Sequence, residues 1–98
     1  MGKRYCIQGT FQDNSGNIVA SGQVTVYECE DDESNGSLAT IFAAKTGGSA
    51  IAGSYVTSDS TGLWRFFYDD EDYPLPGSEF NLLFQKAGMN DTWRKSVR

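Results

Sequence analysis

Short runs of alternating apolar and polar residues, separated by turn-forming residues, constrain this chain more than any other feature. Residues 23–29, QVTVYEC, alternate in this way, and residues 79–86, EFNLLFQK, repeat the pattern. Successive side chains of a strand point to opposite faces, so a period of two predicts strands with one buried face. Gly, Asn, Asp and Ser cluster between the runs and predict turns. We therefore expect an all-β, antiparallel fold.

Six segments are predicted as strands or short extended pieces: about 5–11, 23–29, 38–45, 54–57, 62–68 and 79–86. Residues 38–45, LATIFAAK, are ambiguous, because Ser37 could cap a two-turn helix, whereas β-branched and aromatic residues at 40–42 favour the strand that we prefer. The 98 residues suffice for one domain. We expect a small antiparallel β-sandwich of six to seven strands over residues 1–88, followed by a short basic C-terminal tail over residues 89–98.

The charge balance excludes several classes of function. The chain has a formal net charge of −5 and no histidine, so it lacks the basic surface of a nucleic-acid-binding protein and the imidazole of Cys–His and Ser–His enzymes. We expect no enzymatic activity, no cofactor and no nucleic-acid partner. The sequence does not decide whether an acidic turn binds calcium. No apolar run is long enough for a signal peptide or a membrane span, so we expect no membrane and synthesis in a cytoplasm.

Charged and aromatic side chains near the C-terminus, and one acidic turn, are the candidate partner contacts. Trp93 lies beside Arg94 and Lys95 in a polar segment, where burying the indole requires something outside the local strand pattern. Asp70 and Asp72 belong to the acidic run 69–72 and could meet a cation or a basic neighbour. Exposed aromatics could alternatively stack on sugars, and the candidates are Trp64, Tyr68, Tyr73 and Trp93. Strand spacing instead favours Trp64 and Tyr68 as core residues.

The two cysteines are predicted to be neighbours. If the first two strands form a hairpin with Phe11 opposite Val24, then Cys6 faces Cys29 on the outer face. The thiols would then be near enough to bridge if oxidised, although reduced thiols are the default in a cytoplasm.

Two turns combine an aspartate with a glycine three residues later. These pairs are Asp13 with Gly16 and Asp59 with Gly62. An aspartate can accept hydrogen bonds from backbone amides in a tight turn, while the glycine adopts the positive φ that closes it. Both turns are predicted to stabilise the fold and not to bind a ligand.

Three segments in order, GTFQDNSGNIVASGQVTVYE, TSDSTGLWRFFYDDEDY and FNLLFQKAGM, resemble the carboxypeptidase-regulatory-like, or transthyretin-like, β-sandwich. Such domains combine an Asp-x-x-Gly turn, a V-x-V-Y strand, a T-x-D-x-x-G-x-W/F-x-F turn and strand, and a closing L-x-F-x-K-x-G. The resemblance covers about residues 5–88.

The middle segment, LATIFAAKTGGSAIAGSYVTSDSTGLWRFFYDDEDY, is similar to modules of tailed-bacteriophage virion proteins. It departs from their pattern at Asp72, where glycine commonly precedes the tyrosine, and at GSYV, where NPV is more usual. The resemblance implies no catalytic residues. It implies a non-enzymatic structural protein of the virion, in a head fibre or decoration, a neck or a tail adaptor.

Such a protein would be made in the host bacterial cytoplasm, bind other virion structural proteins and form a homo-oligomer. The alternative is a carbohydrate-binding or host-adhesion module that recognises a host glycan through exposed aromatics.

Overall fold

The described part of the chain contains seven antiparallel strands, which confirms the predicted all-β sandwich. The computed structural model describes residues 3–30, 32, 34–73 and 78–98, and this part of the chain contains no helix. The strands are β1 (Arg4–Thr10), β2 (Gln23–Cys29), β3 (Asn35–Leu38), β4 (Tyr55–Thr57), β5 (Leu63–Asp69), β6 (Phe80–Gln85) and β7 (Thr92–Val97).

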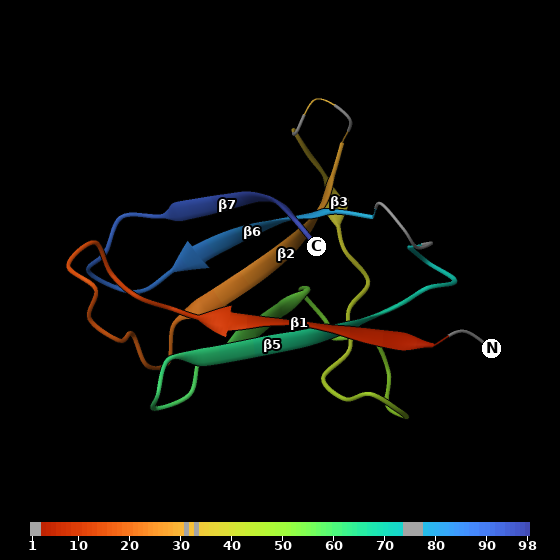
Figure 1. The fold of residues 1–98 in the computed structure, drawn as a ribbon, viewed down its shortest axis with the longest axis horizontal. Coiled ribbons are helices and arrows are strands. Elements are labelled where there is room, and N and C mark those ends of the chain that lie inside the picture. Colours follow the sequence, from red (N-terminus) through yellow and green to blue (C-terminus); the bar gives the residue numbers. More distant parts are fainter. Residues whose placement is uncertain (1–2, 31, 33, 74–77) are drawn as a thin grey trace.

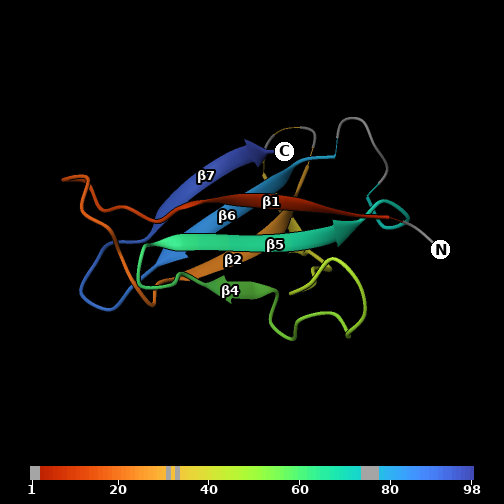
Figure 2. The ribbon, with the colours of Figure 1, turned by 60° about the horizontal axis from the view of Figure 1, so that its bottom comes forward.

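The strands form two sheets that face each other (Figures 1 and 2). The smaller sheet pairs β1 with β5, and the larger runs β3-β2-β6-β7, with β4 also paired to β2. Both β3 and β4 are short: β4 pairs with the first residues of β2, and β3 pairs with its last residues. One long central strand, β2, therefore holds the larger sheet together.

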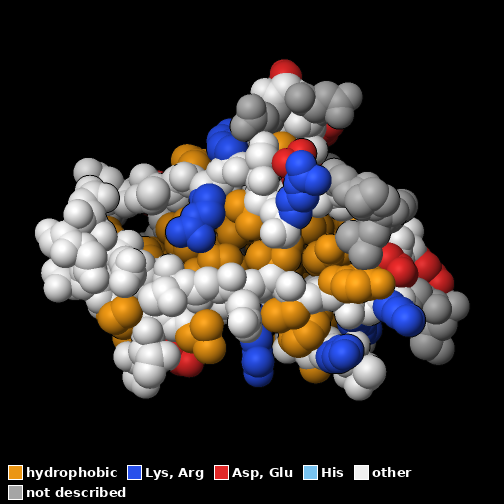
Figure 3. All heavy atoms as spheres, viewed as in Figure 1, with side chains coloured by type: hydrophobic (Ala, Val, Ile, Leu, Met, Phe, Trp, Pro, Cys, Tyr) orange, Lys and Arg blue, Asp and Glu red, His pale blue; other side chains and the backbone are white. Residues whose placement is uncertain are grey.

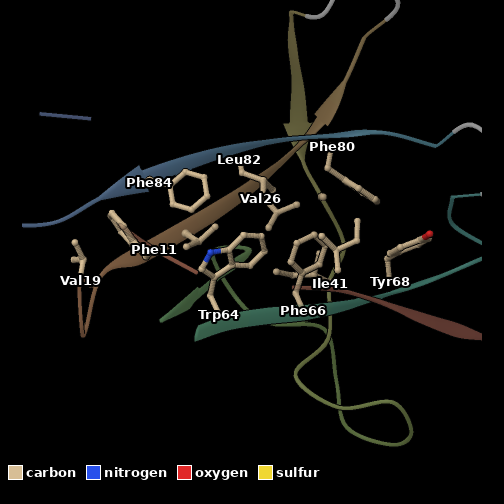
Figure 4. Close-up of a cluster of buried hydrophobic side chains, with 13 residues drawn as sticks. Phe11, Val19, Val26, Ile41, Trp64, Phe66, Tyr68, Phe80, Leu82 and Phe84 are labelled. Carbon is tan, nitrogen blue, oxygen red and sulfur yellow. The ribbon is translucent and has the colours of Figure 1, made fainter. Parts of the chain in front are cut away.

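The predicted core faces are confirmed. Val24 and Val26 on β2 meet the side chains of β6 and β5 between the sheets, and both are fully buried. The alternating buried residues of β5 are Trp64, Phe66 and Tyr68, and those of β6 are Phe80, Leu82 and Phe84 (Figure 4). Tyr68 of β5 and Phe80 of β6 pack against each other between the two sheets, with ring centroids 5.1 Å apart. The aromatic rings of β5 and β6 thus join the two sheets.

The predicted hairpin between the first two strands is wrong. Strand β1 pairs with β5, so that Cys6 lies opposite Phe67 in the smaller sheet. Cys29 lies in the larger sheet opposite Asn35. Both cysteines are free thiols. The segment between β1 and β2 carries the chain from one sheet to the other, which alternation within each strand could not reveal.

The predicted basic tail is also wrong, because residues 92–97 form β7 at the edge of the larger sheet. Leu83 pairs with Trp93, and Phe80 pairs with Val97 across a register shift. Ser96 has a positive φ of 56° at this irregularity. The shift breaks the period of two that would have indicated a strand.

Residues 38–45 form neither a helix nor a continuous strand. Leu38 ends β3, Ala39 and Ile41 are buried, and Phe42 forms a single antiparallel bridge with Phe67 of β5. The chain then leaves the sheet in a loop in which consecutive glycines, Gly47 and Gly48, both have positive φ. The predicted strand therefore holds only at its first residue.

The two aspartate–glycine turns are confirmed. Asp59 Oδ1 accepts hydrogen bonds from the amides of Thr61 (2.8 Å) and Leu63 (3.0 Å), and Gly62 has a φ of 80°. Asp13 Oδ1 accepts from the amides of Ser15 and Asn17, both at 2.9 Å, and Gly16 has a φ of 84°. The same local device therefore closes both turns.

The two glycines offer a matched test of this device. Gly16→Ala should cost roughly 1 kcal/mol, because its added Cβ meets nothing within 4 Å and only the positive φ is unfavourable. Gly62→Ala should cost roughly 2–4 kcal/mol, because its Cβ would also lie 2.8 Å from Ile18 Cγ2 and 3.0 Å from the Phe11 carbonyl oxygen. Urea unfolding of both variants measures the difference, and equal costs would contradict the packing assigned to Gly62.

Candidate functional site

The outer face of the larger sheet carries a row of large side chains across four strands. Thr25 pairs with Tyr55 of β4 and with Leu83 of β6, and Leu83 pairs with Trp93 of β7. Directly paired residues point to the same face, and the neighbouring Val24 and Val26 point inward, so this row points outward. Two residues along β2, Tyr27 pairs with Leu38 of β3 on the same face. We call the set Tyr27, Leu38, Tyr55, Leu83 and Trp93 the outer patch.

The outer patch gathers most of the exposed large hydrophobic residues of the described chain. Leu38, Tyr55 and Trp93 are 47%, 42% and 39% exposed, whereas the other two of this kind, Ile18 and Leu63, lie elsewhere. Isolated exposed hydrophobic residues are common, but several on one face indicate an interaction surface. The patch is therefore the best candidate for a functional site.

Trp93 is held in place at the edge of the patch. Its ring lies 5.5 Å from that of Tyr27, and Lys95 Nζ lies 5.2 Å from the Trp93 ring centroid. Tyr27 is itself partly buried on the central strand. The indole is thus positioned by a neighbouring ring and a neighbouring cation, and part of its surface stays open to solvent.

A polar cluster beside the patch anchors β7. Asn81 is fully buried; its amide nitrogen donates to Asn35 Oδ1 (2.8 Å), and its Oδ1 accepts from the Ser96 amide (3.1 Å). Lys95 Nζ donates to the same Asn35 oxygen at 3.5 Å. These bonds link β3, β6 and β7 across the outer face. Asn81 was not among the predicted site residues, because its only signal in the sequence is a polar residue between Phe80 and Leu82.

The predicted partner contacts lie in three different places. Trp93 and Lys95 point outward together, but Arg94 points to the other face, with its guanidinium carbon 5.2 Å from the Phe84 ring centroid. Asp70 and Asp72 lie in the turn after β5, and Asp70 Oδ1 accepts a hydrogen bond from the Lys3 amide at 2.9 Å. No single surface therefore contains all five residues.

Three of the four candidate sugar-stacking aromatics are committed to the interior. Trp64 and Tyr68 are buried. Tyr73 packs 5.0 Å from Phe80, and its hydroxyl accepts from the Thr40 amide and donates to Glu28 Oε2, both at 2.8 Å. Burial is the main cause that raises the pKa of Tyr73 above its usual value. Of these four residues, only Trp93 is exposed, whereas Tyr73 is partly buried.

The turn carboxylates are satisfied by their own turns. The backbone amide of Asn17 is the main cause that lowers the pKa of Asp13, and the hydroxyl and amide of Thr61 lower that of Asp59. Among the described residues, no three cysteine or carboxylate side chains gather in a group that could hold a metal ion. Nor does any helix in the described ranges have the length and hydrophobicity to cross a bilayer.

Comparisons with known proteins give no relative for this arrangement: no family model, curated protein or solved structure matches the chain.

The lowered pKa of Asp59 predicts a pH dependence of stability. A carboxyl whose pKa is lower in the folded state stabilises the protein above its unfolded pKa of about 3.9, and this contribution disappears as the pH falls through the folded value. Asp59→Asn should therefore lower the free energy of unfolding at pH 6, and the deficit should shrink towards pH 2. Urea unfolding at pH 6 and at pH 2 measures this loss of stability. Asp72→Asn removes a similar exposed charge and is the control; an equal, pH-independent deficit in both variants would contradict the assignment.

Proposed function

We propose that this chain is a non-enzymatic structural protein that acts through protein–protein assembly, as a component of a tailed-bacteriophage virion. The observation that carries the assembly role is the outer patch, because a rigid sheet face with several accessible apolar side chains is suited to burial against a neighbouring subunit. Burying a Leu or an aromatic side chain completely contributes roughly 1.5–3 kcal/mol. Aromatic anchors such as Trp93 are enriched in interface centres.

The virion assignment is supported by the sequence resemblance. The segment SDSTGLWRFFYDDEDY contributes the aspartate–glycine turn and the buried strand β5, which are structural elements of the fold. In a head fibre, a neck or a tail adaptor, such a module would serve by holding its neighbours. A homo-oligomer and other virion proteins are the proposed partners.

The exposed aromatic rings of the patch favour one alternative, a carbohydrate-binding or host-adhesion module. Trp93 and Tyr55 both present accessible surface on the same sheet face, and aromatic faces are suitable for stacking against sugar rings. Binding to a glycan array that Trp93→Ala abolishes, with assembly unchanged, would favour this alternative over assembly.

Leucines on opposite sides of the sandwich provide the test of the assembly role. Leu38 lies in the outer patch and Leu63 on the smaller sheet, with exposures of 47% and 38%. Leu38→Ala and Trp93→Ala should each reduce incorporation of the chain into particles at least about tenfold, which corresponds to 1.4 kcal/mol. Leu63→Ala is the matched control and should incorporate normally.

Incorporation is measured by quantifying the chain in purified particles after complementation with each variant, and circular dichroism verifies that each variant is folded. Deleting residues 89–98 is a poorer test, because it removes β7 and uncovers the edge of β6. Normal incorporation of both patch variants would refute the proposed role of the outer patch.

A further inference from the structure

A basic groove lies on the side of the molecule formed by the smaller sheet and the loop after Phe42. It has a volume of about 670 Å³, and Lys3, Arg4 and Lys45 line it together with Cys6 and Phe67. Three of the chain's eight cationic residues thus meet in one hollow of a protein whose net charge is −5. The acidic turn after β5 borders the same hollow, because Asp69 pairs with Arg4 and Asp70 Oδ1 accepts a hydrogen bond from the Lys3 amide.

Arg4 builds the wall of this groove. Its guanidinium donates to the carbonyl oxygens of Ala44 (3.1 Å) and Gly47 (2.6 Å) and lies 3.7 Å from the Phe42 ring centroid. Phe42 in turn exchanges two backbone hydrogen bonds with Phe67, at 2.8 and 2.9 Å. The loop is therefore tied to the sheet, and the groove exists before any partner binds.

Lys45 is the cation of the groove most available to a partner. It lies in the exposed loop, and within the described ranges no carboxylate forms an ion pair with it. The alkyl stem of a lysine can follow apolar surface such as Phe67 while its ammonium group stays in water. The groove thus offers apolar surface and an exposed positive charge to an acidic segment.

The chain's own β2–β3 connection has the complementary charge. Residues 30–33 read Glu-Asp-Asp-Glu, and of these Glu30 and Asp32 are described and exposed. Asp32 accepts hydrogen bonds from the Ser34 amide (3.1 Å) and hydroxyl (2.5 Å), which lower its pKa and keep it charged. Lys95 of the same chain also lowers the pKa of Asp32, and further positive charge stabilises adjacent carboxylates that repel one another.

The two surfaces face different directions on one molecule. In Figure 1 the β2–β3 hairpin projects at the top, whereas the loop that borders the groove lies at the bottom. Figure 3 shows Lys and Arg side chains along this lower margin, with acidic side chains beside them at the right, and a further acidic side chain at the top. One copy therefore cannot satisfy its own groove with its own hairpin.

We propose that the basic groove binds the acidic β2–β3 hairpin of a second copy of this chain, through ion pairs between Lys45 and the carboxylates of Glu30 and Asp32. This contact makes a second copy of the chain one of the partners in the assembly role proposed above, and it rests on that role. The groove is separate from the outer patch, so the two proposed contacts can be tested independently.

Charge reversal with cross-rescue tests the contact. The purified full chain should self-associate in sedimentation experiments at 30 mM salt and dissociate at 0.5 M, where the Debye length falls to a few ångströms. Lys45→Glu should weaken self-association at least about fivefold, and so should the Glu30→Lys, Asp32→Lys double variant. Mixing the two variants should restore association between them, because each then supplies the charge that the other lacks. Arg4 is left unchanged because it holds the loop.

Lys86→Glu is the control, because it makes the same change of charge on the connection after β6, outside the groove. The proposal is overturned if the wild-type chain stays monomeric at low salt, if Lys45→Glu behaves like Lys86→Glu, or if the mixed variants fail to associate. It is also overturned by self-association that survives 0.5 M salt and disappears in Leu38→Ala, which would place the contact between copies on the outer patch. Incorporation of the Leu38 variant into particles reports separately on the assembly role.

Discussion

Trp64 packs between the two sheets and contacts aromatic rings from both of them. Its indole is 2% exposed, stacks beside Phe66 and meets the Phe84 ring edge-on, with centroids 5.6 Å apart. On the opposite strand of its own sheet, a Cβ at Gly9 would lie 2.7 Å from the ring, so glycine leaves the space that the indole occupies. The Trp64 ring thus fixes the register of β1 against β5 and the spacing of that sheet from β6.

The aromatic residues fill the space between the sheets, and the outer faces of the two sheets are exposed to solvent to different extents. The larger sheet presents the outer patch, and hydrogen bonds of Asn81 link β6 to β3 and β7 beside it. The smaller sheet presents the basic groove, whose wall Arg4 ties down. One surface is apolar and the other is charged. An assembly built from both would combine salt-resistant and salt-sensitive contacts.

The sequence predicted those features that local chemistry determines, and it failed where pairing partners had to be chosen. Alternation identified the buried faces of β2, β5 and β6, and the Asp–Gly spacing identified both turns, because these depend on a few neighbouring residues. It did not reveal that β1 crosses to the other sheet, since the period of two is the same for either partner, and so Cys6 and Cys29 were wrongly paired. The bulge at Ser96 hid β7. Trp93 was found by its polar surroundings, whereas the rest of the outer patch needed the register.

We propose that the outer face of the larger sheet is an interface between subunits. The most direct measurement is the structure of the chain in its native assembly, in which the solvent exposure of Leu38, Tyr55 and Trp93 can be compared with that of the isolated chain. We predict that all three become buried against a neighbouring subunit, while Trp64 keeps its place between the sheets. An assembled structure in which this face stays open to solvent would contradict the proposed interface.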